Sequence, residues 1–308
     1  MLSPTLFNLY THDIPPPTQP NTRILAYADD ITVITQHPKH EIAAEQGQDY
    51  INILEDWLTT NRLKVSETKS TVTLVTPYNQ EYNTHPHITL YGTPITLSQN
   101  PTILGVTYDN GMTFKTHTDN INTKAKSRLN VLRALSHTTY GHSKEDITTT
   151  YKQYIRPILT YAHTAWQPDL ARVHRTKLQT TQNTALRIAT CCTATSPQGH
   201  LHDETHVLPL KYHWDMRGTH IYNSTVDPNH PLHHMQAPTR TRRQIHNTPA
   251  THYRTLTDSL PPARDGESFR GRVHTHFARE GVASHWKQHA PAQEAAGRGS
   301  RGAAPPPG

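Results

Sequence analysis

Short alternating runs dominate the first part of the chain. Two apolar, β-branched runs, Ile24–Tyr27 and Ile31–Ile34, flank a pair of adjacent aspartates. This pattern predicts a strand, a tight acidic turn and a returning strand. Apolar residues at helical spacing predict a short helix beginning near Pro4 and a longer helix over residues 40–58. The front of the chain is therefore predicted to be α+β.

Further short strands are expected downstream of the second helix. The alternating run at residues 71–75 predicts one strand, and residues 88–97 predict a hairpin turning near Gly92. A further strand is expected over residues 103–108. A glycine inside a strand, here Gly105, indicates either close approach of a partner's backbone or a packing requirement.

The pattern then becomes helical. A helix is predicted over residues 118–135, and a second one starts at Ser143, which could cap it together with Asp146, and continues to Leu159. A third is expected over residues 170–189. The apolar positions of the first helix recur at steps of three and four: Ile121, Ala125, Leu129, Leu132 and Leu135.

Composition indicates that part of the chain does not pack. Hydrophobic residues make up 33% of the sequence, there are 24 prolines, and the mean hydropathy is −0.73. Periodicity fades beyond Ser224 into Pro, His, Arg and Gly, which predicts a disordered tail. We therefore predict three regions: an α+β region at 1–114, a helical region at 115–223 and a disordered tail at 224–308.

Charge is unevenly distributed along the chain. The net charge is −6 over residues 1–114 and +8 over residues 115–187. A polyanion held by the basic middle, with metal ions held by the acidic front, would explain this arrangement. Chance clustering of solvated charges is the alternative.

Cysteine and histidine usage points to no disulfide framework. The two cysteines, Cys191 and Cys192, are adjacent, and this spacing also argues against a zinc site with the histidines that follow. No apolar run is long enough to span a bilayer. We expect a protein without membrane partners that is intracellular, in nucleus or cytoplasm, and not secreted.

The adjacent aspartates carry the clearest chemistry. Carboxylates at the end of two buried strands would repel each other and resist desolvation, so a cation should compensate them. Mg²⁺ is held in proteins by one or two carboxylates together with water and substrate phosphates. An ordinary turn is the alternative for Asp29 and Asp30, because aspartate is a common turn residue.

Four segments in order resemble reverse transcriptases of non-LTR retrotransposons. The acidic hairpin, Tyr27-Ala28-Asp29-Asp30, is similar to the metal-binding hairpin of that family, and Leu2–Asn8 is similar to the segment preceding it. Two later segments, Leu63–Ser70 and Ile103–Asp109, resemble the next two motifs of that family. Weaker similarity extends to about residue 216, through Leu178–Arg187 and Val207–Leu210.

The resemblance implies roles for individual residues. Asp29 and Asp30 would be catalytic metal ligands, for two Mg²⁺ ions in the family. Lys69 would protonate the pyrophosphate leaving group, although a surface lysine is the alternative. Tyr27 and Gly105 would lie against nucleic acid, near the primer end.

The resemblance also implies a fold and partners. The front would be part of a reverse-transcriptase palm, and the helices a thumb that clamps an RNA template paired with a DNA primer. Deoxynucleoside triphosphates would be the substrates. Four basic side chains of the first thumb helix would face the phosphate backbone: Lys124, Lys126, Arg128 and Arg133.

In the resembled family, a further catalytic aspartate precedes the Leu2–Asn8 segment, and these 308 residues contain no counterpart. We therefore expect a C-terminal fragment of an RNA-directed DNA polymerase that is inactive as this chain. The competing hypothesis is a non-catalytic nucleic-acid-binding remnant that uses the basic helices. A structural protein without a nucleic-acid role fits the charge pattern poorly.

Overall fold

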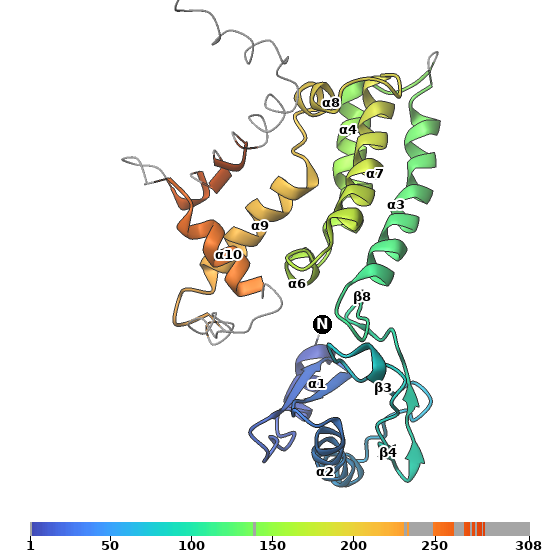
Figure 1. Cartoon of the computed structure of the whole chain (residues 1–308), viewed down its shortest axis with the longest axis vertical. Helices are drawn as coiled ribbons and strands as arrows, with labels where there is room; N and C mark the ends of the chain where they lie inside the picture. Colours follow the sequence, from blue (N-terminus) through green and yellow to red (C-terminus); the bar gives the residue numbers. More distant parts are fainter. Residues whose placement is uncertain are drawn as a thin grey trace, which may run out of the picture. The chain divides into compact units, whose positions relative to one another are not determined.

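The computed structural model divides the chain into two compact units, Met1–His117 and Thr118–Gly308 (Figure 1). The boundary lies close to the predicted one between residues 114 and 115. The structure describes residues 2–137, 140–230, 233, 249–261, 268–271, 273–274, 276–278 and 280.

The first unit combines two helices with short strands. Helix α2 is amphipathic and packs its apolar side against the β1–β2 hairpin and β4, burying Tyr50, Leu54 and Leu58. Both predicted helices are confirmed, with α2 extending two residues further than expected. The elements are α1 (Ser3–Tyr10), β1 (Thr22–Tyr27), β2 (Asp30–Thr35), α2 (His40–Thr60), β3 (Thr71–Val72), η1 (Asn79–Glu81), β4 (Thr89–Leu90), β5 (Thr93–Pro94), β6 (Thr96–Leu97), β7 (Thr102–Ile103) and β8 (Val106–Thr107).

The strands of this unit form two-stranded sheets. β1 pairs antiparallel with β2, β4 with β5 and β7 with β8, whereas β3 runs parallel to β6. The strand predicted over residues 71–75 pairs only at its first two residues. The hairpin near Gly92 is confirmed, since Tyr91 and Gly92 form its turn, both with positive φ. The α+β prediction for this region is confirmed at this level.

The single strand predicted over residues 103–108 is wrong. The structure has a tight hairpin there, with β7 and β8 joined by Leu104 and Gly105. Both turn residues have positive φ, 47° and 80°, as two-residue hairpin turns require. Gly105 therefore supplies a left-handed turn conformation and does not lie inside a strand, as the prediction had assumed.

The second unit is helical in the part that the structure describes. The predicted helix over 118–135 is confirmed as α3, which buries Ile121, Ala125, Leu129 and Leu132. The elements are α3 (Lys115–Leu135), α4 (Lys144–Thr150), η2 (Tyr151–Ile155), α5 (Arg156–Thr160), α6 (His163–Trp166), α7 (Arg172–Thr190), α8 (Gln198–Thr205), α9 (Leu210–Ser224) and α10 (Pro249–Asp258). In Figure 1, α4 and α7 lie side by side, and α10 lies against α9.

The second predicted helix is confirmed with its cap and with one irregularity. Ser143 Oγ accepts a hydrogen bond from the Asp146 N–H at 3.1 Å and donates one to the Asp146 carboxylate at 2.8 Å. From α4 the helix continues as a π-helical turn, η2, into α5. Pro157 has no N–H to donate, which explains why the regular hydrogen-bond ladder is interrupted here.

Two tryptophans hold the centre of the helical unit. Trp166 and Trp214 are almost fully buried and pack edge to face, with 5.4 Å between ring centroids. The Trp214 indole N–H donates to the Leu159 carbonyl oxygen at 3.1 Å. His163 approaches the Trp214 carbonyl oxygen at 3.1 Å, so α5, α6 and α9 are joined.

The prediction of a structureless tail beyond Ser224 is wrong for residues 249–258. These residues form α10, whose Tyr253 is buried against α9. Much of the remaining predicted tail, including all residues from 281 onward, lies outside the described residues. Ten residues are too few to show strong periodicity, which is why the pattern did not predict this helix.

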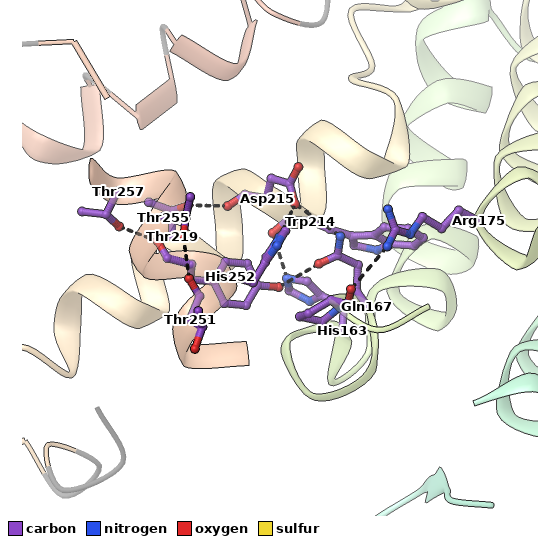
Figure 2. A network of polar contacts seen from close by, with 12 residues as sticks. His163, Gln167, Arg175, Trp214, Asp215, Thr219, Thr251, His252, Thr255 and Thr257 are labelled. Atoms are coloured by element: carbon purple, nitrogen blue, oxygen red, sulfur yellow. Dashed lines mark hydrogen bonds and ion pairs between the residues drawn. The ribbon is translucent and has the colours of Figure 1, made fainter. Parts of the chain in front are cut away.

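A buried polar network anchors α10 (Figure 2). The Asp215 carboxylate lies 3.3 Å from both Gln167 Nε2 and His252 Nε2, and the Tyr253 hydroxyl donates to Gln167 Oε1 at 3.1 Å. Burial of Asp215 is tolerated because its oxygen atoms have these partners. Elements separated by some ninety residues in sequence therefore meet at one polar centre.

Among the described residues, no helix is both long enough and apolar enough to cross a membrane.

Candidate functional site

The acidic hairpin is the first part of the candidate site. β1 and β2 are joined by Ala28 and Asp29, and Asp30 begins β2 opposite Tyr27. The prediction that the aspartates lie at a hairpin tip is confirmed. Both aspartates are exposed. Two carboxylates are thus presented to solvent at the end of a rigid two-stranded ribbon.

The turn itself has an unusual backbone. Ala28 has φ of 51°, in the left-handed region that a residue with a Cβ occupies at a cost of about 1–2 kcal/mol. The other two hairpins of this unit also begin their turns with a left-handed residue, but a glycine follows it there. In the acidic hairpin an aspartate stands at the second position. Such strain at a chemically distinctive turn is typical of functional sites.

The premise that the aspartates end two buried strands is wrong. Leu25 and Tyr27 of β1 are 57% and 67% exposed, and only Thr22 in the two strands is buried. Desolvation therefore does not force a cation onto this turn. The case for a metal rests on the donor chemistry and on similarity to other proteins.

The hairpin offers the kind of ligand atoms that Mg²⁺ prefers, but only two side chains provide them. Asp29 and Asp30 offer hard carboxylate oxygens, which with water can hold this ion. Within the residues that the structure describes, no group of three or more His, Cys, Asp or Glu side chains could hold a metal. Cys191 and Cys192 are exposed and belong to no such group.

Lys69 is not joined to the hairpin. It is exposed in a turn closed by its own N–H, which donates to the Ser66 carbonyl oxygen at 3.3 Å. No hydrogen bond or ion pair links Lys69 to either aspartate in the described part of the chain. The structure leaves its role as an acid untested.

The basic residues of α3 lie on two sides of the helix. Spacing places Lys124 with Arg128 on one side and Lys126 with Arg133 on the other. Lys124, Lys126 and Arg133 are exposed, whereas Arg128 is half-buried. Its guanidinium donates to the Tyr154 carbonyl oxygen at 2.7 Å and lies over the Tyr154 ring. Arg128 is therefore partly occupied in holding η2.

Sequence patterns missed a second group of cations in the helical unit. Packing of α5 on α9 brings Arg156 to the same region as His213 and Arg217. In the sequence, Arg156 directly precedes the apolar residues Pro157–Leu159, which gives no signal of a partner on a distant helix. Separation of 57 residues from His213 hid the grouping.

Large apolar side chains are exposed on α1 and on the strands of the hairpin. α1 buries none of its residues, and its Tyr10 hydroxyl donates to the Asn61 carbonyl oxygen at the end of α2. Soluble monomers rarely expose so many large apolar side chains close together in sequence. Those more than a third exposed on α1, β1 and β2, with Leu2 just before α1, are Leu2, Leu6, Leu9, Tyr10, Leu25, Tyr27 and Ile34.

Comparison with known proteins shows which proteins this chain is similar to. Residues 1–108 match the family model described as reverse transcriptase (RNA-dependent DNA polymerase). The chain is 26% identical over 196 residues to the probable RNA-directed DNA polymerase from transposon X-element of Drosophila melanogaster, covering 62% of this chain and 21% of that protein. It is 25% identical over 194 residues to the RNA-directed DNA polymerase from mobile element jockey of Drosophila funebris, covering 61% and 21%.

A third relative, the probable RNA-directed DNA polymerase from transposon BS of Drosophila melanogaster, is 28% identical over 198 residues, covering 62% of this chain and 22% of that protein. The chain thus spans about a fifth of the length of the curated relatives that it matches. The resemblance to reverse transcriptases of non-LTR retrotransposons, expected from four ordered motifs, is confirmed: residues 1–108 match the family model, and the relatives are RNA-directed DNA polymerases of mobile elements.

Proposed function

We propose that this chain is the segment of an RNA-directed DNA polymerase that carries the metal-binding hairpin and the helices that hold the template–primer duplex. The observation that carries this proposal is the Tyr27–Asp30 hairpin, which presents two adjacent carboxylates inside the segment that matches the reverse transcriptase family. The first unit corresponds to part of a palm, and the helical unit corresponds to a thumb.

The proposed reaction is deoxynucleotidyl transfer. The 3′-hydroxyl of a primer attacks the α-phosphate of a deoxynucleoside triphosphate, and pyrophosphate leaves. Bound Mg²⁺ would supply stabilisation of the charge that develops on the phosphoryl oxygens. Asp29 and Asp30 would provide the carboxylate oxygens for it, and the rigid turn at Ala28 would hold them in position. Lys69 is proposed to donate a proton to the leaving pyrophosphate.

We further propose that this chain alone does not extend a primer. The described residues bring two carboxylates to the hairpin and no third acidic, histidine or cysteine side chain. The apolar surface on α1 and the hairpin supports the same proposal, because it is suited to packing against further polymerase sequence. The relatives are about five times longer than the span that they share with this chain.

The helical unit is proposed to bind an RNA–DNA duplex by shape and phosphate contacts. Lys124, Lys126 and Arg133 are exposed on α3 and available to phosphates. Since these contacts are electrostatic and independent of sequence, affinity should fall steeply as salt rises. Because nucleic-acid partners are proposed, an intracellular location in nucleus or cytoplasm is proposed with them.

Primer extension on an RNA template with Mg²⁺ tests the catalytic part. The purified chain is compared with Asp29→Ala and with Asp13→Ala, which removes the same charge from another exposed turn of the first unit. We expect no extension by any of the three. Extension by the parent and Asp13→Ala but not by Asp29→Ala would show that the chain completes its own site.

Metal binding can be tested without activity. In an amide NMR spectrum of the chain, low concentrations of Mn²⁺, which stands in for Mg²⁺, should broaden the resonances of Asp29 and Asp30 first. Asp29→Ala should remove this selectivity, and Asp13→Ala should not. Uniform broadening of exposed acidic residues would contradict a metal site at the hairpin.

A second candidate function is non-catalytic nucleic-acid binding by the helical unit. It is favoured by the exposed cations of α3, which lie in a unit separate from the aspartates. Duplex binding that survives Asp29→Ala, with no extension even when the remaining part of a related polymerase is added, would establish it. Restored extension in that mixture would instead establish the polymerase segment.

A further inference from the structure

Three cationic or basic side chains meet where α5 packs on α9. On α9, His213 and Arg217 are four residues apart and lie on the same side of the helix as Trp214. That side faces α5, because the Trp214 indole donates to the Leu159 carbonyl oxygen. Arg156 lies three residues before Leu159, on the same side of α5.

Electrostatics agree with this placement. The pKa of His213 is lowered to about 3, first by burial and then by the positive charges of Arg156 and Arg217. The pKa of Arg156 is lowered mainly by burial, is raised by Tyr151 and is lowered further by Arg217. The groups therefore lie close enough to repel one another.

Nothing in the described part of the chain neutralises this group. Arg156 and Arg217 make no ion pair there, and neither guanidinium has a hydrogen-bond acceptor. His213 is 8% exposed, and its Nε2 atom is buried with no hydrogen-bond partner among the described residues. The nearest acid in sequence, Asp215, is held by Gln167 and His252 on the α10 side of α9.

An anion bound here would reduce the repulsion between these positive charges. A buried polar atom without a partner costs about 1–3 kcal/mol. Two guanidinium groups beside one imidazole provide donors for a tetrahedral oxyanion, and arginine binds phosphate with two parallel hydrogen bonds.

We propose that Arg156, His213 and Arg217 form a binding site for one phosphate group of a nucleic-acid backbone on the face of the helical unit where α5 meets α9. This inference rests on the proposed duplex binding and names one of its fixed contacts. It differs from the α3 lysines in its burial, because His213 is buried and Arg156 is half-buried, whereas Arg217 is exposed.

Duplex affinity of the full chain tests the site. Arg156→Gln and Arg217→Gln are compared with Arg254→Gln, which removes the same charge from α10, where Arg254 approaches Asp258. We expect each of the first two to weaken binding of an RNA–DNA duplex about tenfold and to reduce the salt dependence by about one phosphate contact. Equal losses in all three variants would overturn the site and leave the proposed function standing.

A second measurement keeps the test independent of folding and of duplex binding. Imidazole nitrogen NMR of the full chain follows His213 during titration with duplex and, separately, with inorganic phosphate. A His213 shift with duplex that Arg217→Gln abolishes supports the proposal, since Arg217 is exposed and its loss should not disturb the core. A response to inorganic phosphate alone would overturn the assignment to a nucleic-acid backbone.

Discussion

The two units of this chain differ in how well they bury their own apolar surface. Of the largest fully buried side chains among the described residues, only Tyr50 and Phe114 lie in the first unit, and the helical unit holds the rest. The first unit instead exposes leucines along α1 and in β1. Yet the first unit carries the motifs that identify the family.

This difference shows that recognisable chemistry and self-sufficient packing are separate properties. The acidic hairpin is identified by four consecutive residues, whose identity depends on the reaction of the family. A helical bundle needs only apolar residues at the right spacing, and many sequences satisfy that requirement. The unit that is easiest to recognise is therefore the one that leaves more of its large apolar side chains exposed.

The largest expected effect comes from matched leucine truncations in the two units. Leu178 of α7 is fully buried, and Leu6 of α1 is 58% exposed. Leu178→Ala should lower the free energy of unfolding by about 2–5 kcal/mol, because it leaves a cavity. Leu6→Ala should change it by less than about 0.5 kcal/mol. Urea unfolding followed by hydrogen exchange in each unit measures both; similar losses would break the comparison.

Glycine substitutions sharpen the same contrast at single contacts. A Cβ on Gly218 of α9 would lie 2.0 Å from the ring of Tyr253, so Gly218→Ala should displace α10 and cost about 1–3 kcal/mol. The matched change Gly47→Ala, in α2, meets nothing closer than 3.5 Å and should stabilise that helix by up to about 1 kcal/mol. Limited proteolysis of residues 249–258 reports whether α10 has come away. Protection unchanged in Gly218→Ala would contradict this packing.

Acid should weaken the helical unit selectively. The pKa of buried His213 is lowered from 6.5 to about 3. Between these two pH values, the unfolded chain therefore binds a proton at His213 that the folded unit does not bind. Stability is present above about pH 6.5 and is lost as pH falls toward 3, by up to about 1.4 kcal/mol per pH unit. The pKa of His163 is lowered in the same direction, mainly by burial.

His213→Gln should remove part of the pH dependence of the stability of the helical unit. Urea midpoints measured in phosphate-free buffers between about pH 4 and 7 should vary less in this variant than in the parent chain. An unchanged slope would show that the acid sensitivity has another origin.

The smallest expected effects concern helix caps. Ser143→Ala should cost about 1 kcal/mol, because the Asp146 N–H loses its acceptor. The N-cap residue of α2 is Lys39, whose side chain makes no capping hydrogen bond, so Lys39→Ser should stabilise the first unit by a few tenths of a kcal/mol up to about 1. Circular dichroism during thermal unfolding measures both changes. Stabilisation by Ser143→Ala would contradict the capping geometry.

Local patterns predicted much of the architecture. The helical spacing that defines α3 is visible in five apolar residues, and the Ser143 cap follows from residue type and spacing alone. The acidic hairpin follows from two apolar runs around an aspartate pair. These features depend on neighbours in sequence, so sequence contains all the information that they need.

Turn conformation and burial were harder to predict from the sequence. The β7–β8 hairpin was missed because Leu104 is a rare residue at positive φ, and Gly105 alone did not separate a turn from a strand. The burial assumed for the aspartate strands was wrong, because alternating apolar residues show which side could be buried and not whether anything covers it.

By itself, the sequence determined the resemblance of residues 1–108 to reverse transcriptases, the acidic hairpin and the amphipathic helices, since each depends on residues close together in the chain. Only the tertiary structure decided which cations lack partners and which segments meet. The packing of α5 on α9 brings Arg156 near His213. The contact between His252 and Asp215 links α10 to α9. Contacts between distant segments depend on how whole helices pack, and no local pattern records that packing.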